Sequence, residues 1–444
     1  MSSMRGLMRG GMMVMVAGII SVAFATQAMS ARFSSTSYII DASVMNNFGG
    51  QGSSTSFKVT GSGGESIIGN GAGGSYKIGA GYVAQLEKGM QLSVQPSGLL
   101  GHYPLDETVL PSVYDNSANI IDGTAVASPT SVAGKLGTAL SFNGTTQYVG
   151  LGSASSFSGS AFTIESWIKS GTNSGSMAVI TKASNFWLGL DFGKAAIYDW
   201  TGATTCSAST APSLGDNTWH HIAATLTSGT VNGSIIYIDG VQQKTCTWTP
   251  AAQTGSVGIG ATKAASWQQF FNGSIDNVKI FNRVFSTNEV KAEYDAQNAG
   301  NPSGIHLGTT IAGTSSTSSY DAIVRTDAGG YTLGVNQNQN LTNGAYTIPA
   351  VSGSIASPVT WSEGTTKGLG FTLFGTNATA IPGKWSSGNA YAAFPASATT
   401  FYSRTGYSGG AKDYLNMRVR LDVGSSQASG EYQNTITTTG TMIP

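Results

Sequence analysis

Hydrophobic and polar residues alternate over short stretches of this chain, and clusters of Gly, Ser and Asn separate the stretches. Residues 161–168 read Ala-Phe-Thr-Ile-Glu-Ser-Trp-Ile, and residues 218–223 read Thr-Trp-His-His-Ile-Ala. A period of two residues is that of a β-strand, because successive side chains point to opposite faces of a sheet. The pattern therefore predicts an all-β protein with many turns.

Two local signals are more specific. The run 235–238 leads into Asp239-Gly240 and then Val241, which predicts a hairpin because Asp-Gly accepts the positive φ angles of a type I′ turn. Ser286 and Glu289 form a capping box ahead of Val290, which predicts a helix of one or two turns.

The segment before Pro96 contains a repeat. Aromatic residues stand at Tyr38, Phe57 and Tyr76, 19 residues apart each time, and each follows a serine. Short alternating stretches bounded by Gly and Ser predict a repeat of β-hairpins over residues 26–95. Such a repeat is plausible as a unit that docks onto a neighbour or a partner.

The last third of the chain has a similar texture without the repeat. After residue 301, strand signals recur at 322–326, 370–374, 415–423 and 432–437. Short strands at this spacing predict a second β-sandwich over residues 301–444, which we expect to be immunoglobulin-like.

The first 25 residues predict export. Arg5 and Arg9 precede an apolar run at 12–25, and Ala23-Phe24-Ala25 fits a cleavage site for a signal peptide. The run is shorter than the ~20 residues that a spanning helix needs. We therefore expect a mature chain without a transmembrane segment that is secreted or displayed on the cell surface.

The charge balance excludes several classes of partner. The 444 residues include 22 Lys+Arg and 22 Asp+Glu, and charged residues make up 10% of the chain, against about 25% in typical proteins. A neutral chain without basic clusters has no electrostatic attraction for nucleic acid or anionic lipid. In an oxidising compartment, the only two cysteines, Cys206 and Cys246, predict one disulfide rather than a catalytic thiol.

The middle of the chain resembles the laminin-G-like, concanavalin-A-type jelly-roll modules of extracellular proteins. Five motifs follow one another in family order: GKLGTALSFNG at 134–144, FTIESW at 162–167, NTWHH at 217–221, YIDG at 237–240 and FNGSIDNVKIF at 271–281. The resemblance implies a jelly-roll domain over residues 96–300. It also implies a binding module for glycans, proteins or cell surfaces, or a non-catalytic part of an enzyme, among which the fold alone does not choose.

The resemblance further implies a calcium site. Several jelly-roll relatives bind Ca²⁺ at the rim of the sandwich through an Asp near the last strand and backbone carbonyls, and Asp276 occupies the matching position. Asp106, from a strand expected beside the last one, is a second candidate ligand. The alternative is that Asp276 simply caps a tight Gly-rich turn.

We expect no catalytic residue in this domain. Glycoside hydrolases that share the sandwich carry clustered carboxylates on one strand, because hydrolysis needs two carboxyl groups about 5–9 Å apart. No E-x-D or D-x-E pattern occurs near Glu165. A polysaccharide hydrolase, or an accessory module of one, remains the second alternative.

A sugar-binding surface is the leading hypothesis. An exposed aromatic ring can stack on a sugar while nearby polar groups bind the hydroxyls, and Tyr198-Asp199-Trp200 offers both, with Trp248 as a second aromatic platform. The predicted function is that of a non-catalytic extracellular binding or adhesion protein that recognises carbohydrate or glycoconjugate. The first alternative is a cell-surface assembly component that joins other surface proteins or its own copies through sheet edges, with the jelly roll as a spacer.

Overall fold

The structure is a computed structural model, and it describes residues 31–443 apart from 35–38, 45–48, 54–56, 63–68, 74–75, 81–90, 154, 309, 327, 379 and 407–411. The predicted signal peptide, 1–25, lies outside the described residues. The chain divides into two units, Met1–Gly89 and Met90–Pro444. Among the described residues, no helix is long and apolar enough to cross a membrane.

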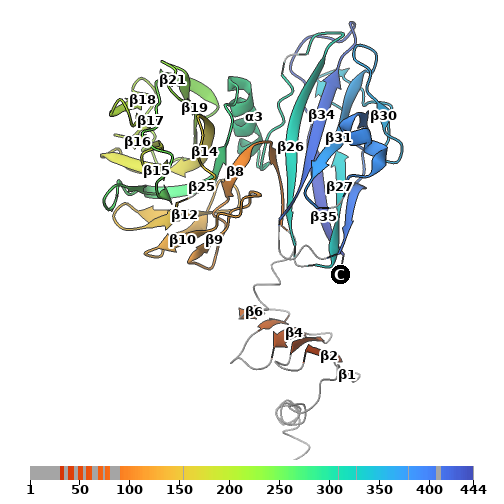
Figure 1. The fold of residues 1–444 in the computed structure, drawn as a ribbon, viewed down its shortest axis with the longest axis horizontal. Helices are drawn as coiled ribbons and strands as arrows, with labels where there is room; N and C mark the ends of the chain where they lie inside the picture. Colours follow the sequence, from red (N-terminus) through yellow and green to blue (C-terminus); the bar gives the residue numbers. More distant parts are fainter. Residues whose placement is uncertain are drawn as a thin grey trace, which may run out of the picture. The chain divides into compact units, whose positions relative to one another are not determined.

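The first unit contains one antiparallel sheet in which six strands follow each other in chain order (Figure 1). The strands are β1 (Ala31–Ser34), β2 (Ile39–Val44), β3 (Gly49–Ser53), β4 (Phe57–Ser62), β5 (Gly69–Gly73) and β6 (Tyr76–Ala80). This meander agrees with the repeat of β-hairpins that the sequence predicts.

The jelly roll consists of two large antiparallel sheets. The first, called the β16 sheet, contains β18 (Thr204–Ser207), β17 (Lys194–Asp199), β16 (Phe186–Asp191), β15 (Ser176–Lys182), β22 (Val257–Ile259), β13 (Tyr148–Gly150), β10 (Gly123–Val126) and β9 (Ser112–Val113), in this order. The second, called the β14 sheet, contains β11 (Thr130–Ala133), β12 (Thr138–Asn143), β25 (Asn272–Phe281), β14 (Ala161–Lys169), β19 (His220–Thr227), β20 (Ser234–Ile238) and β21 (Val241–Cys246), and β8 (Leu99–Tyr103) pairs with β25.

The inner faces of these two sheets form one hydrophobic core. Val179, Leu188 and Ile197 of the β16 sheet belong to the same buried cluster as Ile164 and Ile222 of the β14 sheet. Alternation along each strand places apolar side chains inside, so the remaining side chains face outward. The all-β jelly roll predicted from the sequence is confirmed.

The predicted hairpin is also present. Strand β20 ends at Ile238 and β21 begins at Val241, and the two turn residues have positive φ, 50° at Asp239 and 73° at Gly240. These are the angles that a type I′ turn requires.

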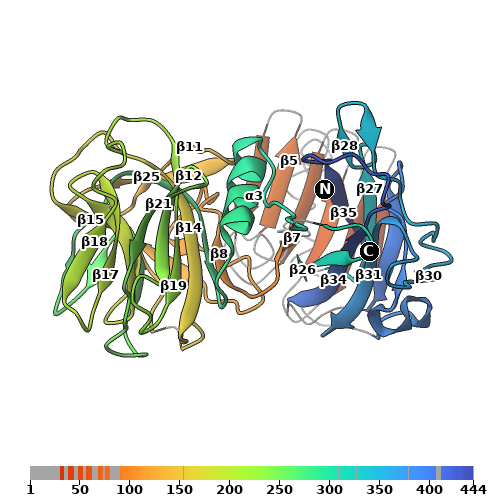
Figure 2. The same cartoon turned by 90° about the horizontal axis from the view of Figure 1, so that it is seen from above.

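The predicted helix is longer than expected. α3 spans Thr287–Asn298, begins with the capping box of Ser286 and Glu289, and lies against the outer face of the β14 sheet (Figure 2). Its later buried positions are Glu293 and Gln297, which are polar and therefore carry no hydrophobic period. Their burial depends on partners from the sheet, which the sequence pattern does not show.

A buried polar network connects α3 to the sheet. Lys279 Nζ donates to Glu293 Oε2 over 2.8 Å and lies 3.4 Å from Glu165 Oε1, and all three side chains are at most 1% exposed. Gln297 accepts from Trp167 Nε1 and donates to both carboxylates. These contacts satisfy groups that would be costly to bury unpaired, so they fix the position of the helix.

The disulfide predicted between Cys206 and Cys246 is present, with the two Cα atoms 6.0 Å apart. Cys206 lies in β18, at one end of the β16 sheet, and Cys246 lies in β21, at the end of the β14 sheet. The bond therefore clips the two sheets together along one side of the sandwich.

The C-terminal part is a second β-sandwich. One sheet contains β31 (Gly368–Thr376), β34 (Asp413–Asp422), β26 (Ser315–Arg325) and β7 (Gln91–Pro96), and the other contains β33 (Thr399–Thr405), β27 (Gly330–Gln337) and β35 (Ile436–Ile443). Short strands β23 (Thr262–Lys263) with β24 (Trp267–Gln268), β28 (Thr342–Asn343) with β29 (Tyr346–Thr347), and β30 (Val359–Thr360) with β32 (Ala390–Tyr391) form separate pairs, and Gly383–Gly388 is a 3₁₀ segment.

This second sandwich begins before the jelly roll in the sequence. β7 pairs with β26, with Val94 opposite Ala322, so the jelly roll is inserted between two adjacent strands of one sheet. The sequence analysis assigned residues up to 95 to the hairpin repeat, because a short strand does not reveal which distant strand it pairs with. Lys412, just before β34, donates to the carbonyl oxygens of Asp115 and Ser117 in the jelly roll.

Removing the disulfide should lower the stability of the sandwich. In the chain-entropy model, a crosslink that spans 40 residues stabilises the folded state by at most about 4 kcal/mol. A variant with both Cys206→Ser and Cys246→Ser should unfold at lower urea concentration, measured by tryptophan fluorescence. Reductant should lower the midpoint of the parent chain and leave that of the variant unchanged; an equal effect on both would contradict the assignment.

Two neighbouring histidines should give opposite pH dependences. Burial lowers the pKa of His221 to about 4, beside Glu165, Lys279, Glu293 and Asp239. Between pH 6.5 and 4 the unfolded chain therefore binds the proton that native His221 refuses, and the free energy of unfolding falls as the pH falls.

His220 has the opposite sign, because hydrogen bonds to Asp239 and Asp216 raise its pKa. It stabilises the fold at low pH and loses this effect as the pH rises through its folded-state pKa. In urea unfolding from pH 4 to 8, His221→Gln should flatten the acid loss and His220→Gln should steepen it. Parallel profiles for the two variants would refute this account.

Candidate functional site

An aromatic band crosses the outer face of the β16 sheet. The band consists of Tyr148, Trp267, Trp187, Tyr198 and Trp200, which lie on or over neighbouring strands β13, β22, β16 and β17 and the turn after β17. Inward residues alternate with these positions, such as Val149 beside Tyr148 and Ile197 beside Tyr198. The band is thus a consequence of strand alternation combined with aromatic residues at outward positions.

At one end of the band, the rings of Tyr148 and Trp267 stack with centroids 4.2 Å apart. Trp267 belongs to β24, and its ring lies so close to β22 that a Cβ at Gly258 would be 2.4 Å from it. Lys263 places its ammonium 5.6 Å from the same ring. Glycine at position 258 is therefore required for the indole to rest on the sheet.

At the other end, the rings of Tyr198 and Trp200 meet edge to face with centroids 5.0 Å apart. Both pack against a small cluster of Ala178, Ala196 and Trp187, and both remain half-buried. Trp200 Nε1 is buried and has no acceptor among the described residues. This indole therefore keeps a hydrogen-bond donor that a ligand or water could use.

Gln269 joins the two ends of the band. Its Oε1 accepts from Trp187 Nε1 over 2.9 Å, which fixes the buried indole, and the residue itself is exposed. Its backbone oxygen accepts from Ala178 N, so the 269–270 segment lies across β15. The band thus combines half-buried aromatic rings with an exposed amide, the pairing of surfaces that sugar binding needs.

Two of the four ligand-binding residues predicted from the sequence lie on this surface and two do not. Tyr198 and Trp200 belong to the band. Trp248 is 0% exposed, packs edge to face with Phe162 and donates from Nε1 to the Asn185 carbonyl oxygen, so its role as an exposed platform is corrected. It comes just after β21, where the loop turns inward between the two sheets.

Asp199 is also taken up by the fold. It is 7% exposed, and its Oδ1 accepts from Thr249 N over 3.0 Å. A Cβ at Gly202 would lie 2.6 Å from Asp199 Oδ2, which shows that the carboxylate packs against its own turn. The sequence analysis missed Tyr148, whose outward position follows from the alternation with Val149 in β13.

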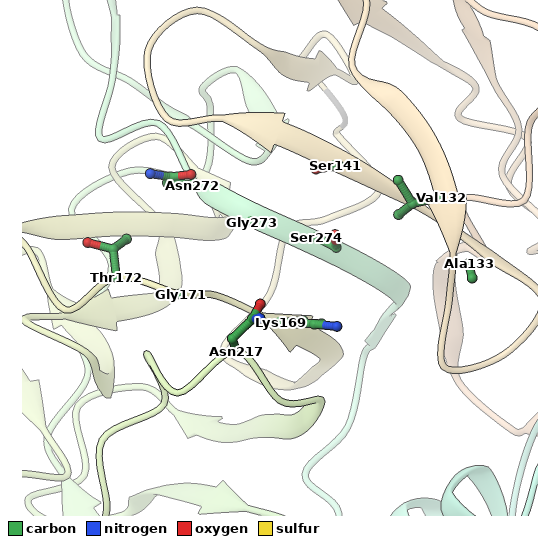
Figure 3. A pocket seen from close by; sticks show the side chains of 10 residues that line it. All are labelled: Val132, Ala133, Ser141, Lys169, Gly171, Thr172, Asn217, Asn272, Gly273 and Ser274. Carbon is green, nitrogen blue, oxygen red and sulfur yellow. The ribbon is translucent and has the colours of Figure 1, made fainter.

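A second candidate is a polar groove of about 560 Å³ on the outer face of the β14 sheet (Figure 3). Figure 3 shows Val132 and Ala133 on one side of β25 and Lys169 on the other. The further lining residues are Ser141, Gly171, Thr172, Asn217, Asn272, Gly273 and Ser274. The groove offers hydroxyl, amide and ammonium groups, and no aromatic ring lines it.

The two predicted calcium ligands lie beside one turn, 134–138. Asp276 is buried, and its Oδ2 accepts from Lys135 N and Leu136 N over 2.6 and 2.9 Å. Asp106 Oδ1 accepts from Thr138 N over 2.7 Å. Burial raises the pKa of Asp276 to about 7, and the nearby Asp106 carboxylate raises it further.

The chemistry of this turn fits a divalent cation. Asp276 Oδ1 is buried without a hydrogen-bond partner, and a cation would satisfy it and reduce the repulsion between the two carboxylates. Among the described residues, no group of three or more His, Cys, Asp or Glu side chains converges, so backbone carbonyls and water would supply the other ligands. The calcium site stays a prediction, and capping of the turn is the role that the hydrogen bonds already show.

Comparison with protein families supports the resemblance seen in the sequence. Residues 143–291 match the family model described as the concanavalin A-like lectin/glucanases superfamily. No curated protein matches this chain.

Three solved structures are similar at low identity. Domain 4 of the extracellular arabinanase AbnA from Geobacillus stearothermophilus, in complex with arabinotriose, is 19% identical over 44% of this chain and 98% of that domain, with a TM-score of 0.36. The binding domain of Paraclostridial Mosquitocidal Protein 1 is 14% identical over 52% and 64%, with a TM-score of 0.37. Trypanosoma rangeli sialidase is 15% identical over 46% and 34%, with a TM-score of 0.35.

Calcium should raise the melting temperature of the full chain if the turn binds it. A ligand present at a hundred times its Kd stabilises the native state by about 2.7 kcal/mol, which amounts to several degrees. The shift between chelator and CaCl₂ should disappear in Asp276→Asn and persist in Asp191→Asn, because Asp191 only accepts from Ser176 Oγ on the other sheet. An unchanged melting temperature in the parent chain would leave Asp276 as a turn residue alone.

Proposed function

We propose that the protein is an extracellular binding protein whose jelly roll holds carbohydrate without chemistry, through the aromatic band. The observation that carries this proposal is the row of half-buried rings across the outer face of the β16 sheet, with Gln269 exposed beside them. Sugar rings present C–H groups that pack on aromatic faces, while their hydroxyls bind amides and water. A neutral chain suits a neutral polysaccharide better than a charged one.

The band survives the burial of two candidate indoles. Trp187 and Trp248 are at most 5% exposed and cannot stack on a ligand, whereas Trp200 and Trp267 are half-buried and stand at opposite ends of the band. Neighbouring strands lie about 4.8 Å apart, so a band that crosses from β13 to β17 is about 19 Å long. A surface of that length favours a chain of sugars over a single ring.

A non-catalytic role is part of the same proposal. The superfamily includes both lectins and glucanases, so the fold alone does not separate the two. Glu165 and Glu293 are close together, but both contact Lys279 and both are buried beneath α3. Carboxylates neutralised by a buried lysine do not reach a polysaccharide on the surface.

Binding should be measured on the full chain by affinity electrophoresis and a glycan array with neutral oligosaccharides. Trp200→Ala and Trp267→Ala should each weaken binding about tenfold, which corresponds to about 1.4 kcal/mol. Phe192→Ala is the matched control, because Phe192 is 67% exposed at the β16–β17 turn and lies outside the band.

The other outcomes assign the site elsewhere. Loss of binding only in Lys169→Ala and Asn217→Ala would move it to the polar groove. Release of reducing sugar from the bound polysaccharide would make the protein an enzyme, and no binding to any glycan would overturn the proposal. Unfolding midpoints of all variants show whether lost binding reflects lost folding.

A further inference from the structure

The six-stranded sheet of the first unit is built from three copies of one pairing. Phe33 is opposite Ile40 in the hairpin β1–β2, Gly52 is opposite Val59 in β3–β4, and Gly71 is opposite Ile78 in β5–β6. Each pair is displaced by 19 residues from the one before. The period of the sequence repeat is therefore also the period of the backbone register.

The junctions between hairpins follow the same period. Ile40 of β2 is opposite Gly52 of β3, and Val59 of β4 is opposite Gly71 of β5. Gly52 and Gly71 thus have a paired strand on both sides. In this sheet, β1 and β6 are the end strands, so among the described residues Phe33 and Ile78 each have a paired strand on one side only.

The two end strands are complementary. A further junction of the same kind would pair β6 with a strand equivalent to β3 and β5, and β1 is such a strand one period earlier. The chain after these strands supports the equivalence, because Ser-Ser-Thr-Ser at 34–37 is repeated at 53–56, followed by Tyr38 and Phe57. Within one sheet, β1 and β6 are separated by five strand spacings of about 4.8 Å, or about 24 Å.

We propose that β6 of one copy pairs with β1 of a second copy, antiparallel, with Ile78 opposite Phe33. The occupant of the β6 edge is therefore another molecule of this chain. The contact continues the junction that β2–β3 and β4–β5 already make within the chain. It adds the second neighbour that each end strand lacks among the described residues, and exposed strand edges favour such pairing.

The distribution of charge favours this register. With Ile78 opposite Phe33, Lys77 is opposite Ser34 and Arg32 is opposite Gly79, so the two cations are not directly opposed. A slip of one residue exchanges the two faces of the strand. A slip of two residues keeps the faces but places Lys77 opposite Arg32, and like charges directly opposite each other are destabilising.

The contact is head to tail, because different edges of the two copies meet. Each added copy presents a new free β6 edge, so the assembly is open-ended and grows as a filament rather than closing as a dimer. This property concerns the first unit alone and goes beyond the carbohydrate binding proposed for the jelly roll. Assembly and glycan binding can therefore fail independently.

Cysteine crosslinking of full-length chains tests the register. Two single variants, Phe33→Cys and Ile78→Cys, carry different tags and are mixed under mild oxidation without glycan. Their cysteines are the only free thiols, because Cys206 and Cys246 are bonded to each other. Directly opposed pairs alternate between hydrogen-bonded and non-hydrogen-bonded, so Arg32→Cys with Gly79→Cys is tested as the neighbouring pair.

The expected result is a disulfide-linked heterodimer from at least one of these two mixtures and no dimer from any variant alone. The matched control, Ala31→Cys with Ile78→Cys, shifts the register by two residues and should lose the crosslink, because disulfides do not form between distant Cα atoms. Homodimers of Ile78→Cys would indicate a two-fold contact between β6 edges and overturn the proposal. So would the absence of heterodimer in both in-register mixtures, or equal crosslinking in the control.

Discussion

Lys279 and its two carboxylate partners decide which surface of the jelly roll is available. The ammonium contacts Glu165 in the adjacent strand and Glu293 in α3, and all three side chains are buried. A buried ion pair adds little stability compared with apolar packing, but it leaves an uncompensated charge if one member moves. The helix is therefore held in one position on the outer face of the β14 sheet.

The position of α3 makes the two outer faces different. On the β14 sheet, Trp167 lies under the helix, stacked with Tyr294 at 5.7 Å and hydrogen-bonded to Gln297. On the β16 sheet, Trp200 and Trp267 stay half-buried, because only the short 262–270 segment crosses that face. Aromatic residues thus serve as core on one sheet and as a candidate binding surface on the other.

The two sandwiches share more than a linker. β7 precedes the jelly roll and β26 follows it, and the two pair in one sheet, so both ends of the jelly roll are held by hydrogen bonds. Leu99, Phe281 and Val290 of the jelly roll share a buried cluster with Ile323 of the C-terminal sandwich. Insertion through paired strands restrains the two domains more than a flexible connection would.

The sequence determined the features that depend on neighbours along the chain. Alternation predicted the strands, Asp239-Gly240 predicted the hairpin, and the two cysteines could pair only with each other. Tertiary structure decided burial and distant pairing: Trp200 and Trp248 stand near similar turns, yet one lies on the sheet and the other between the sheets. The same holds for β7 and for Gln297, since the partner that each one meets comes from a distant part of the chain. Local patterns fix the conformation of a segment, but what covers it depends on elements that come together only in the folded protein.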